Sequence, residues 1–485
     1  MIKKQSLAKQ SFYNVIYKGY NIIYPLITSA YISRILKASG VGSVSFAINI
    51  VTYFTMAAAL GLPNYAIKAL AGVRDNQEQL NKTFSELAKI VLWSSIIATG
   101  VYYLALFTFL RSTVKNFELN AILGIIIASN AINYEWLFQA VEDYKFIAVR
   151  TVIIKTFSLA FMFLTVKTKS DLSEYIWVYS LTLAANNIAN GISANRYVHI
   201  RRTNLNCKKH IKAVMILFAA SCATEIYTLL DSTMLGILCP SKYLGYYSNA
   251  SRIVRASYGL IIAATAVYFP RLSYLYRKED KTEYKLTLEN DYELSMFLAF
   301  PAVAGLIGIS GEVIPFLFGD DFTPAIFTLQ MLSVLTVVFS VATVFGHTAL
   351  IIYEKENRIL IATIIGAIVN FTLNSFFIPR FEQNGAAFAS IISECIVTTI
   401  LLFSSLSIFK IRLLSSNIVK TFFASVAMFA AIYPIGLLPT KNIIKIIIAF
   451  LVGILVYALC SLLLKNKAMI MVLDKLHIPM PNNKR

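Results

Sequence analysis

Long apolar runs recur along this 485-residue chain, and they limit the folds open to it. Hydrophobic residues make up 57% of the sequence, charged residues only 14%, and the mean hydropathy is +0.66. A run of about twenty apolar residues spans a bilayer core of roughly 30 Å, and lipid offers no partner to an unpaired backbone amide. We therefore predict an all-α polytopic membrane protein with about fourteen transmembrane helices. They are expected near residues 12–33, 41–61, 87–109, 119–138, 147–166, 173–193, 212–236, 243–269, 291–309, 324–352, 359–378, 384–407, 416–437 and 443–464.

Basic residues are distributed unevenly among the predicted connections. With a cytoplasmic N-terminus, the connections after even-numbered helices and both termini hold roughly three times as many Lys and Arg as the opposite connections. Two connections show this best, and their basic residues are Arg196, Arg201, Arg202, Lys208, Lys209 and Lys212, and Arg271, Arg277, Lys278, Lys281 and Lys285. The asymmetry predicts that both termini are cytoplasmic. The net charge of +19 is spread over many short connections, which favours contact with an anionic leaflet over nucleic-acid binding.

Motifs typical of catalytic and metal sites do not occur in the sequence. It contains no HExxH, phosphate-binding loop or GxSxG motif, and its five cysteines form no CxxC pair. No predicted connection much exceeds about 25 residues, which is too short for a soluble catalytic domain. We therefore expect no cofactor and no metal site, and a transporter rather than an enzyme.

Two segments about 200 residues apart repeat each other. Residues 42–50 and 245–253 both fit the pattern G-x-x-S-x-A-x-x-I, and each leads along an apolar helix to a proline, Pro63 or Pro270. Duplicated halves in a polytopic membrane protein are typical of transporters, in which two bundles rock about a central site. The repeat therefore predicts alternating access between two related halves.

Four basic residues lie deep inside predicted helices. A charge at membrane depth is costly, so it normally faces a cavity or a partner. Arg252 and Arg255 are three residues apart near the middle of one helix, hence on one face of it, and they predict a cationic cavity for an anionic substrate. Lys18 and Lys155 are further candidates for substrate binding, although each could instead reach the membrane surface by snorkelling.

Carboxylates at depth form a second group of candidates. Glu225 and Asp231 share one predicted helix, Glu394 lies in a later one, and Glu135 lies near the end of the helix expected at 119–138. They could bind a coupling H⁺ or Na⁺, or serve as counter-ions to the basic residues, and both readings stay open.

Asparagines at depth are the third polar group inside the predicted helices. Asn186 and Asn187 lie in one helix, and Asn370 and Asn374 lie on one face of another. We interpret them as interhelical hydrogen-bonding residues rather than as ligands.

Several motifs together resemble bacterial polysaccharide exporters of the Wzx flippase type. They are the helix exit GLPNYAIK at 61–68, the segment YEWLFQAVEDYKFI at 134–147 with RTVIIK at 150–155, and the later segments at 231–236, 245–250, 270–273 and 384–390. The resemblance runs in order from about residue 10 to about residue 410.

This resemblance implies the fold of the multidrug/oligosaccharidyl-lipid/polysaccharide exporter superfamily. It places two pseudo-symmetric six-helix lobes at 1–200 and 201–412, followed by two extra helices and a cytoplasmic tail at 413–485. It implies that the substrate is an undecaprenyl-pyrophosphate-linked oligosaccharide, moved to the outer leaflet of a bacterial cytoplasmic (inner) membrane for O-antigen or capsule synthesis. Membrane lipids, a polysaccharide polymerase and assembly proteins are the partners it implies.

Two other functions remain open at this stage. The nearer is a lipid-II flippase or a drug or cation exporter of the same fold, although a cation exporter would favour a cavity dominated by carboxylates. The more distant is a membrane-embedded polysaccharide polymerase, which would normally carry a large outer loop that this sequence lacks.

Overall fold

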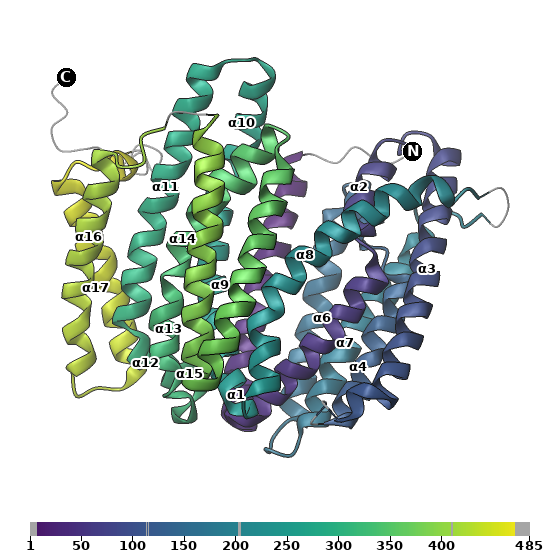
Figure 1. Ribbon diagram of the computed structural model, residues 1–485, viewed down its shortest axis with the longest axis horizontal. Coiled ribbons are helices and arrows are strands. Elements are labelled where there is room, and N and C mark those ends of the chain that lie inside the picture. The colour runs from purple at the N-terminus through teal and green to yellow at the C-terminus, as the bar shows by residue number, and fades with distance from the viewer. Residues whose placement is uncertain (1–6, 113, 115, 202–204, 409–410, 471–485) are drawn as a thin grey trace. The chain divides into compact units, whose positions relative to one another are not determined.

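The computed structural model of the chain is built of helices (Figure 1) and describes residues 7–112, 114, 116–201, 205–408 and 411–470. Across these ranges no residue is in a β-strand. In chain order the α-helices are α1 (Leu7–Ala59), α2 (Leu62–Ala71), α3 (Gln77–Phe107), α4 (Phe117–Ser129), α5 (Glu135–Ala140), α6 (Tyr144–Thr165), α7 (Leu172–Ala194), α8 (Lys208–Leu238), α9 (Ser241–Thr265), α10 (Tyr268–Arg277), α11 (Lys281–Gly308), α12 (Ser310–Phe318), α13 (Ala325–Ser333), α14 (Leu335–Ala342), α15 (Glu356–Leu406), α16 (Ser416–Ile432) and α17 (Asn442–Leu463).

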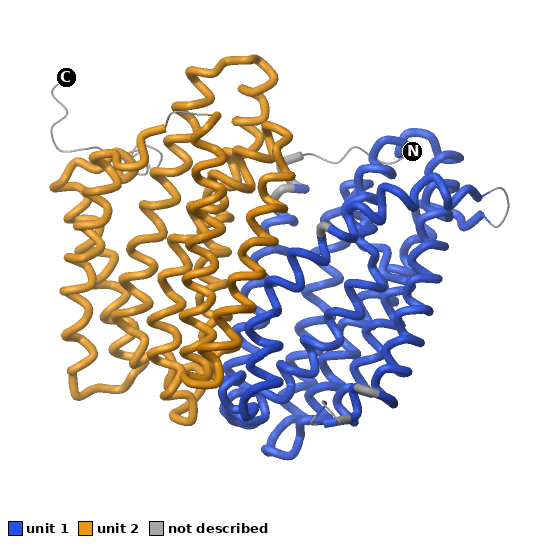
Figure 2. The backbone as a smooth tube through the Cα atoms, viewed as in Figure 1, with its two compact units in different colours: residues 1–245 blue, residues 246–485 orange. Residues whose placement is uncertain are grey.

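Two compact units divide the chain (Figure 2). The first, Met1–Gly245, contains α1 to α8 and the start of α9, and the second, Tyr246–Arg485, contains the remaining helices. The last two helices, α16 and α17, coincide with the two extra helices expected after residue 413. The division of the chain at residues 200 and 412 stays a prediction.

Two helices are too long to cross a membrane once. A straight helix of the 53 residues of α1 would measure about 80 Å, more than twice the bilayer core. The backbone leaves the helical region at Lys37 in α1 and at Glu382 in α15, where φ is 60° and 47°. Each long helix is therefore two membrane segments joined by a single left-handed residue.

The number of membrane segments is close to the prediction. Within the described residues, nine helices are long and apolar enough to cross a membrane, or eleven if each of two bent pairs is one span. The breaks in α1 and α15 divide two of these spans, which brings the number of segments to thirteen, close to the number expected. The prediction of an all-α polytopic membrane protein is confirmed.

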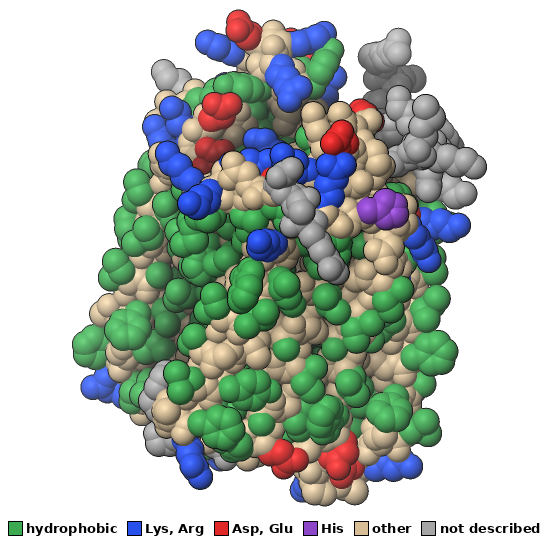
Figure 3. Space-filling view, turned by 90° about the vertical axis from the view of Figure 1, so that its right-hand side faces the viewer, with side chains coloured by type: hydrophobic (Ala, Val, Ile, Leu, Met, Phe, Trp, Pro, Cys, Tyr) green, Lys and Arg blue, Asp and Glu red, His purple; other side chains and the backbone are tan. Residues whose placement is uncertain are grey.

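Apolar side chains cover the middle of the face drawn in Figure 3, and charged side chains gather toward its ends. Large exposed hydrophobic residues of the first unit include Trp93, Leu104, Phe157, Leu164 and Ile192. Apolar residues exposed at this density fit a surface that faces lipid rather than water. Lys and Arg gather mainly at the upper end of the view, as expected for one charged side of a membrane protein.

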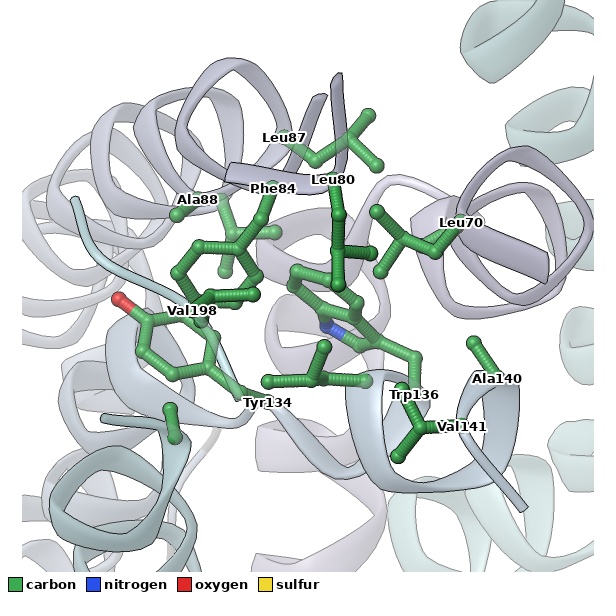
Figure 4. Packing of buried hydrophobic residues seen from close by; sticks show 14 of the residues in the cluster. Leu70, Leu80, Phe84, Leu87, Ala88, Tyr134, Trp136, Ala140, Val141 and Val198 are labelled. Carbon is green, nitrogen blue, oxygen red and sulfur yellow. The ribbon is translucent and has the colours of Figure 1, made fainter. Parts of the chain in front are cut away.

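The first unit contains a buried cluster with an aromatic centre (Figure 4). Phe84 of α3 packs against Tyr134 and against Trp136 of α5, with ring centroids 5.0 and 5.4 Å apart. Leu70 of α2 belongs to the same buried cluster. This packing fixes the short helix α5 beside α2 and α3, and α5 carries a central residue of the site described below.

The repeated glycines make a close backbone contact inside the first unit. A Cβ on Gly42 of α1 would overlap the carbonyl group of Ser241, and a Cβ on Gly245 would overlap the carbonyl oxygen of Ala38. The start of α9 therefore packs directly against the second half of α1 through two residues without side chains. This contact explains why glycine occupies the first position of both repeats.

We expect Gly42→Ala to destabilise the protein, because the new methyl group has no space beside the Ser241 carbonyl. Overpacking of this kind costs about 1–3 kcal/mol. Thermal unfolding of the purified protein in detergent should show a lower Tm. Gly100→Ala is the matched control, because nothing lies within 4 Å of a Cβ at that position. Equal Tm values for the two variants would contradict the close approach of α1 and α9.

Candidate functional site

A polar cavity of about 360 Å³ lies inside the first unit, between α1, α4, α5, α6 and α7. Its volume is in the range of small-molecule sites, about 300–1,000 Å³. Its polar lining consists of Tyr17, Asn21, Thr55, Asn130, Asn133, Glu135, Gln139, Arg150, Thr151, Lys155, Asn186 and Asn187. So many polar side chains at one place in a membrane unit mark a candidate binding site.

A helix break brings Glu135 to this cavity. The membrane span expected at 119–138 is present as Phe117–Ala140, but its helix is interrupted: α4 ends at Ser129, a 3₁₀ turn follows, and α5 begins at Glu135. Asn133 replaces part of the lost helical bonding, since its Oδ1 accepts from the Glu135 amide at 3.5 Å and from Asn190 Nδ2 at 3.4 Å. Broken membrane helices of this kind are tolerated where they line a cavity.

Arg150 of α6 and Glu135 form the central ion pair. Arg150 Nη2 lies 2.7 Å from Glu135 Oε2, and the Arg150 side chain is only 5% exposed. The Tyr17 hydroxyl donates to Glu135 Oε1 at 2.8 Å, and Arg150 Nη1 donates to Asn190 Oδ1. One buried network therefore joins α1, α5, α6 and α7.

Lys155 lies further along α6 on the same cavity. Its ammonium donates to Asn21 Oδ1 and lies 4.8 Å from the centre of the Tyr24 ring. Within the described chain no carboxylate pairs directly with Lys155. The charged residues that line the cavity are Glu135, Arg150 and Lys155, so the cavity has a surplus of one positive charge.

A second cavity of about 370 Å³ adjoins the first. The two have Thr55, Ile126, Asn130, Asn133 and Leu183 in common. Glu225 of α8 lines the second cavity, whose other walls are mostly apolar. Glu225, one of the predicted ion-coupling candidates, therefore lies beside the polar cavity within the first unit.

The other predicted basic residues lie elsewhere. Lys18 is exposed on α1 and does not line the two cavities. Arg252 and Arg255 lie on α9 in the second unit, where Arg252 donates to Asn249 at 3.2 Å and Arg255 Nε to Ser251 Oγ at 3.3 Å. Their substrate-binding roles, and that of Lys155, stay predictions.

The remaining carboxylates are also apart from the polar cavity. Asp231 is buried on α8, and Glu394 is half-buried on α15 in the second unit. Ion coupling by Glu225, Asp231 or Glu394 stays a prediction. Throughout the described ranges no group of three or more His, Cys, Asp and Glu side chains could hold a metal ion.

Arg150 is the site residue that sequence reasoning missed. It lies early in its predicted helix, where an arginine is ordinarily interpreted as a charge near the membrane surface. The available signal was its place in the segment 150–155, directly after the segment that carries Glu135. The ion pair in the structure shows that these two residues meet.

The comparisons with known proteins decide the family. Residues 7–276, more than half of the chain, match the model of the polysaccharide biosynthesis protein family. The chain belongs to this family. The predicted membership of the polysaccharide exporters is thereby confirmed.

Two relatives and two solved structures are similar to this family member. A protein of Escherichia coli (strain K12) named "Putative O-antigen transporter" is 25% identical over 82% of this chain and 96% of its own length. A "Probable low-salt glycan biosynthesis flippase" of Haloferax volcanii is 26% identical over 49% of this chain and 50% of its own.

The solved structures show the fold. A lipid II flippase in an inward closed conformation has a TM-score of 0.73 at 18% identity, covering 97% of this chain and all of the other. MATE in a bent conformation has a TM-score of 0.59 at 12% identity, covering 85% of this chain and 95% of the other.

We expect Glu135→Ala to destabilise the first unit, because it leaves the buried Arg150 guanidinium without a carboxylate. Removing one partner of a buried ion pair typically costs about 3–5 kcal/mol. Chemical unfolding of the purified protein would measure this loss.

Glu78→Ala is the matched control for this experiment. Glu78 pairs with Arg201 at 3.0 Å, but both side chains are largely exposed, and an exposed pair contributes about 0–1 kcal/mol. Comparable losses in the two variants would show that the Glu135–Arg150 pair is not a buried interaction.

Proposed function

We propose that this protein flips oligosaccharide repeat units carried on undecaprenyl pyrophosphate from the cytoplasmic to the outer leaflet of a bacterial cytoplasmic membrane. The flipped units would feed synthesis of an O-antigen or capsule-type polysaccharide. Membership of the polysaccharide biosynthesis family and the names of the two relatives support this substrate class. The fold shared with solved membrane transporters supports transport by alternating access rather than catalysis.

The surplus positive charge of the polar cavity is the observation that carries the proposal. Arg150 and Lys155 face a single carboxylate there, and in a low-dielectric membrane unit this surplus attracts anions and repels cations. A sugar linked through phosphate meets this requirement. A cationic drug does not, which disfavours the cation-exporter alternative.

The two arginines of α9 are proposed to bind the phosphate groups of the substrate. Arg252 and Arg255, with Lys18 and Lys155, would hold the pyrophosphate, since a guanidinium can bind two phosphate oxygens at once. Both termini would be cytoplasmic, and a polysaccharide polymerase and assembly proteins would be partners.

Ion coupling is the second element of the proposal. Glu225, which lines the cavity that adjoins the polar one, would exchange H⁺ or Na⁺ as the charge of the substrate arrives and leaves. Asp231 and Glu394 are the further candidates. The alternative role of these carboxylates, as static counter-ions, would leave transport insensitive to an ion gradient.

Transport in reconstituted vesicles tests the proposal. Vesicles that contain the protein should move an intact lipid-linked oligosaccharide across the bilayer, and Lys155→Ala should slow this at least tenfold, because a charge-assisted contact is lost. Lys89→Ala, which removes an exposed lysine of α3, should transport normally. Failure of the wild-type protein to move the substrate, or full activity of Lys155→Ala, would contradict the account.

The same vesicles separate coupling from static pairing. Coupling predicts that an imposed pH or Na⁺ gradient changes the wild-type rate and no longer changes the rate of Glu225→Gln. A wild-type rate that ignores both gradients would exclude a coupling role for these carboxylates.

A further inference from the structure

Six carboxamide side chains line the polar cavity of the first unit. They are those of Asn21, Asn130, Asn133, Gln139, Asn186 and Asn187. A carboxamide offers two N–H donors and one carbonyl acceptor, so the groups that remain free in the cavity determine which ligand it can bind.

The orientation of three of these amides follows from their partners. Asn186 Nδ2 lies 2.8 Å from the Thr182 carbonyl oxygen, and Gln139 Nε2 lies 3.4 Å from Glu135 Oε1. Both partners can only accept, so both amide nitrogens must face them.

The third amide is oriented by a neighbouring hydroxyl. Asn187 Nδ2 lies 3.0 Å from Ser129 Oγ, and the Ser129 hydroxyl already donates to the Ile126 carbonyl oxygen. Ser129 therefore accepts from Asn187, and the Asn187 carbonyl oxygen is turned away from it.

The carbonyl oxygens of Gln139, Asn186 and Asn187 are thus left as acceptors. Within the described part of the chain none of the three has a hydrogen-bond partner, and none is among the fully buried unpaired atoms. They belong to side chains that line the cavity, so a ligand there can reach them.

Free acceptors require a ligand that carries donors. Phosphate oxygens at neutral pH offer almost none, and a cation is disfavoured by Arg150 and Lys155. Sugar hydroxyls donate as well as accept. The ammonium of Lys155 donates one N–H to Asn21, and its other N–H groups can donate to the sugar oxygens.

We propose that this carboxamide face, formed by Gln139, Asn186 and Asn187, binds hydroxyl groups of the sugar portion of the substrate. The inference rests on the proposed function for the source of the sugar. It assigns the glycan to the carboxamide face of this cavity and leaves the pyrophosphate to the basic side chains, Lys155 among them.

Binding of the free glycan tests the assignment through Trp136, which lines the cavity. The chain has three tryptophans, and the other two, Trp93 and Trp177, are exposed, so Trp93→Phe/Trp177→Phe leaves Trp136 as the sole emitter. The probe is the glycan released by mild acid from the lipid-linked oligosaccharides of cells that express the protein, and inorganic pyrophosphate is the comparison.

The glycan should change Trp136 emission in a saturable way. Adding Asn186→Ala/Asn187→Ala should weaken its binding about tenfold, the loss of two hydrogen bonds. Asn195→Ala, at the exposed end of α7, should bind like the parent. Inorganic pyrophosphate should give no response that depends on Asn186 and Asn187.

A modified glycan keeps the test decisive if the double variant does not fold. Permethylation removes every hydroxyl donor but leaves the oxygens, so the permethylated glycan should bind the unaltered cavity at least tenfold more weakly. Equal binding of the two glycans, or of the double variant and Asn195→Ala, would overturn the assignment.

The vesicle assay distinguishes failure of the carboxamide assignment from failure of the proposed function. Vesicles that flip the intact substrate while the glycan leaves Trp136 unchanged would refute the carboxamide site alone. Vesicles that do not flip it would refute the function, whatever the glycan does.

Discussion

The arrangement of the helices in the first unit depends on how the buried guanidinium of Arg150 is paired. Arg150 is 5% exposed inside a membrane-spanning helix, where an unpaired charge would be very costly. Its partner, Glu135, is the first residue of α5, directly after the break between α4 and α5, and Asn133 accepts a hydrogen bond from the Glu135 amide at that break. Tyr17 and Asn190 complete the network from α1 and α7. The ion pair and its hydrogen bonds therefore connect α1, α5, α6 and α7 around the cavity.

The same ion pair determines the chemistry of the cavity. Glu135 neutralises one of two cations, which leaves the charge of Lys155 uncompensated, and Gln139 donates to Glu135 and turns its carbonyl oxygen away from that carboxylate. The cavity thus combines a net positive charge with free acceptors. A neutral or acidic polyhydroxylated ligand satisfies both features, whereas a cation satisfies only the second.

The sequence predicts the membrane segments well because burial in lipid requires long apolar runs. It does not show that the helix breaks between α4 and α5, since Asn130, Asn133 and Glu135 are also compatible with a polar face on a helix that continues to residue 138. Glu135 was therefore expected near a helix end rather than at a break, and Arg150 was not expected to meet it. Depth in a predicted helix marks Lys155 and Glu225 as candidates, and both line cavities. Asn187 bridges α7 to Ser129, as predicted for interhelical asparagines, but its second polar atom remains free for a ligand.

Photo-crosslinking tests most directly whether the cavity of the first unit receives the glycan. A benzophenone amino acid would replace Leu183, which lines both cavities, or Leu181, which is exposed on the same helix. After irradiation with a lipid-linked oligosaccharide labelled in its sugars, mild acid would cleave the sugar–phosphate bond and leave label only where the glycan itself is attached. The account predicts retained label at position 183 and little at position 181. Equal label at both positions, or label at position 181 alone, would contradict it.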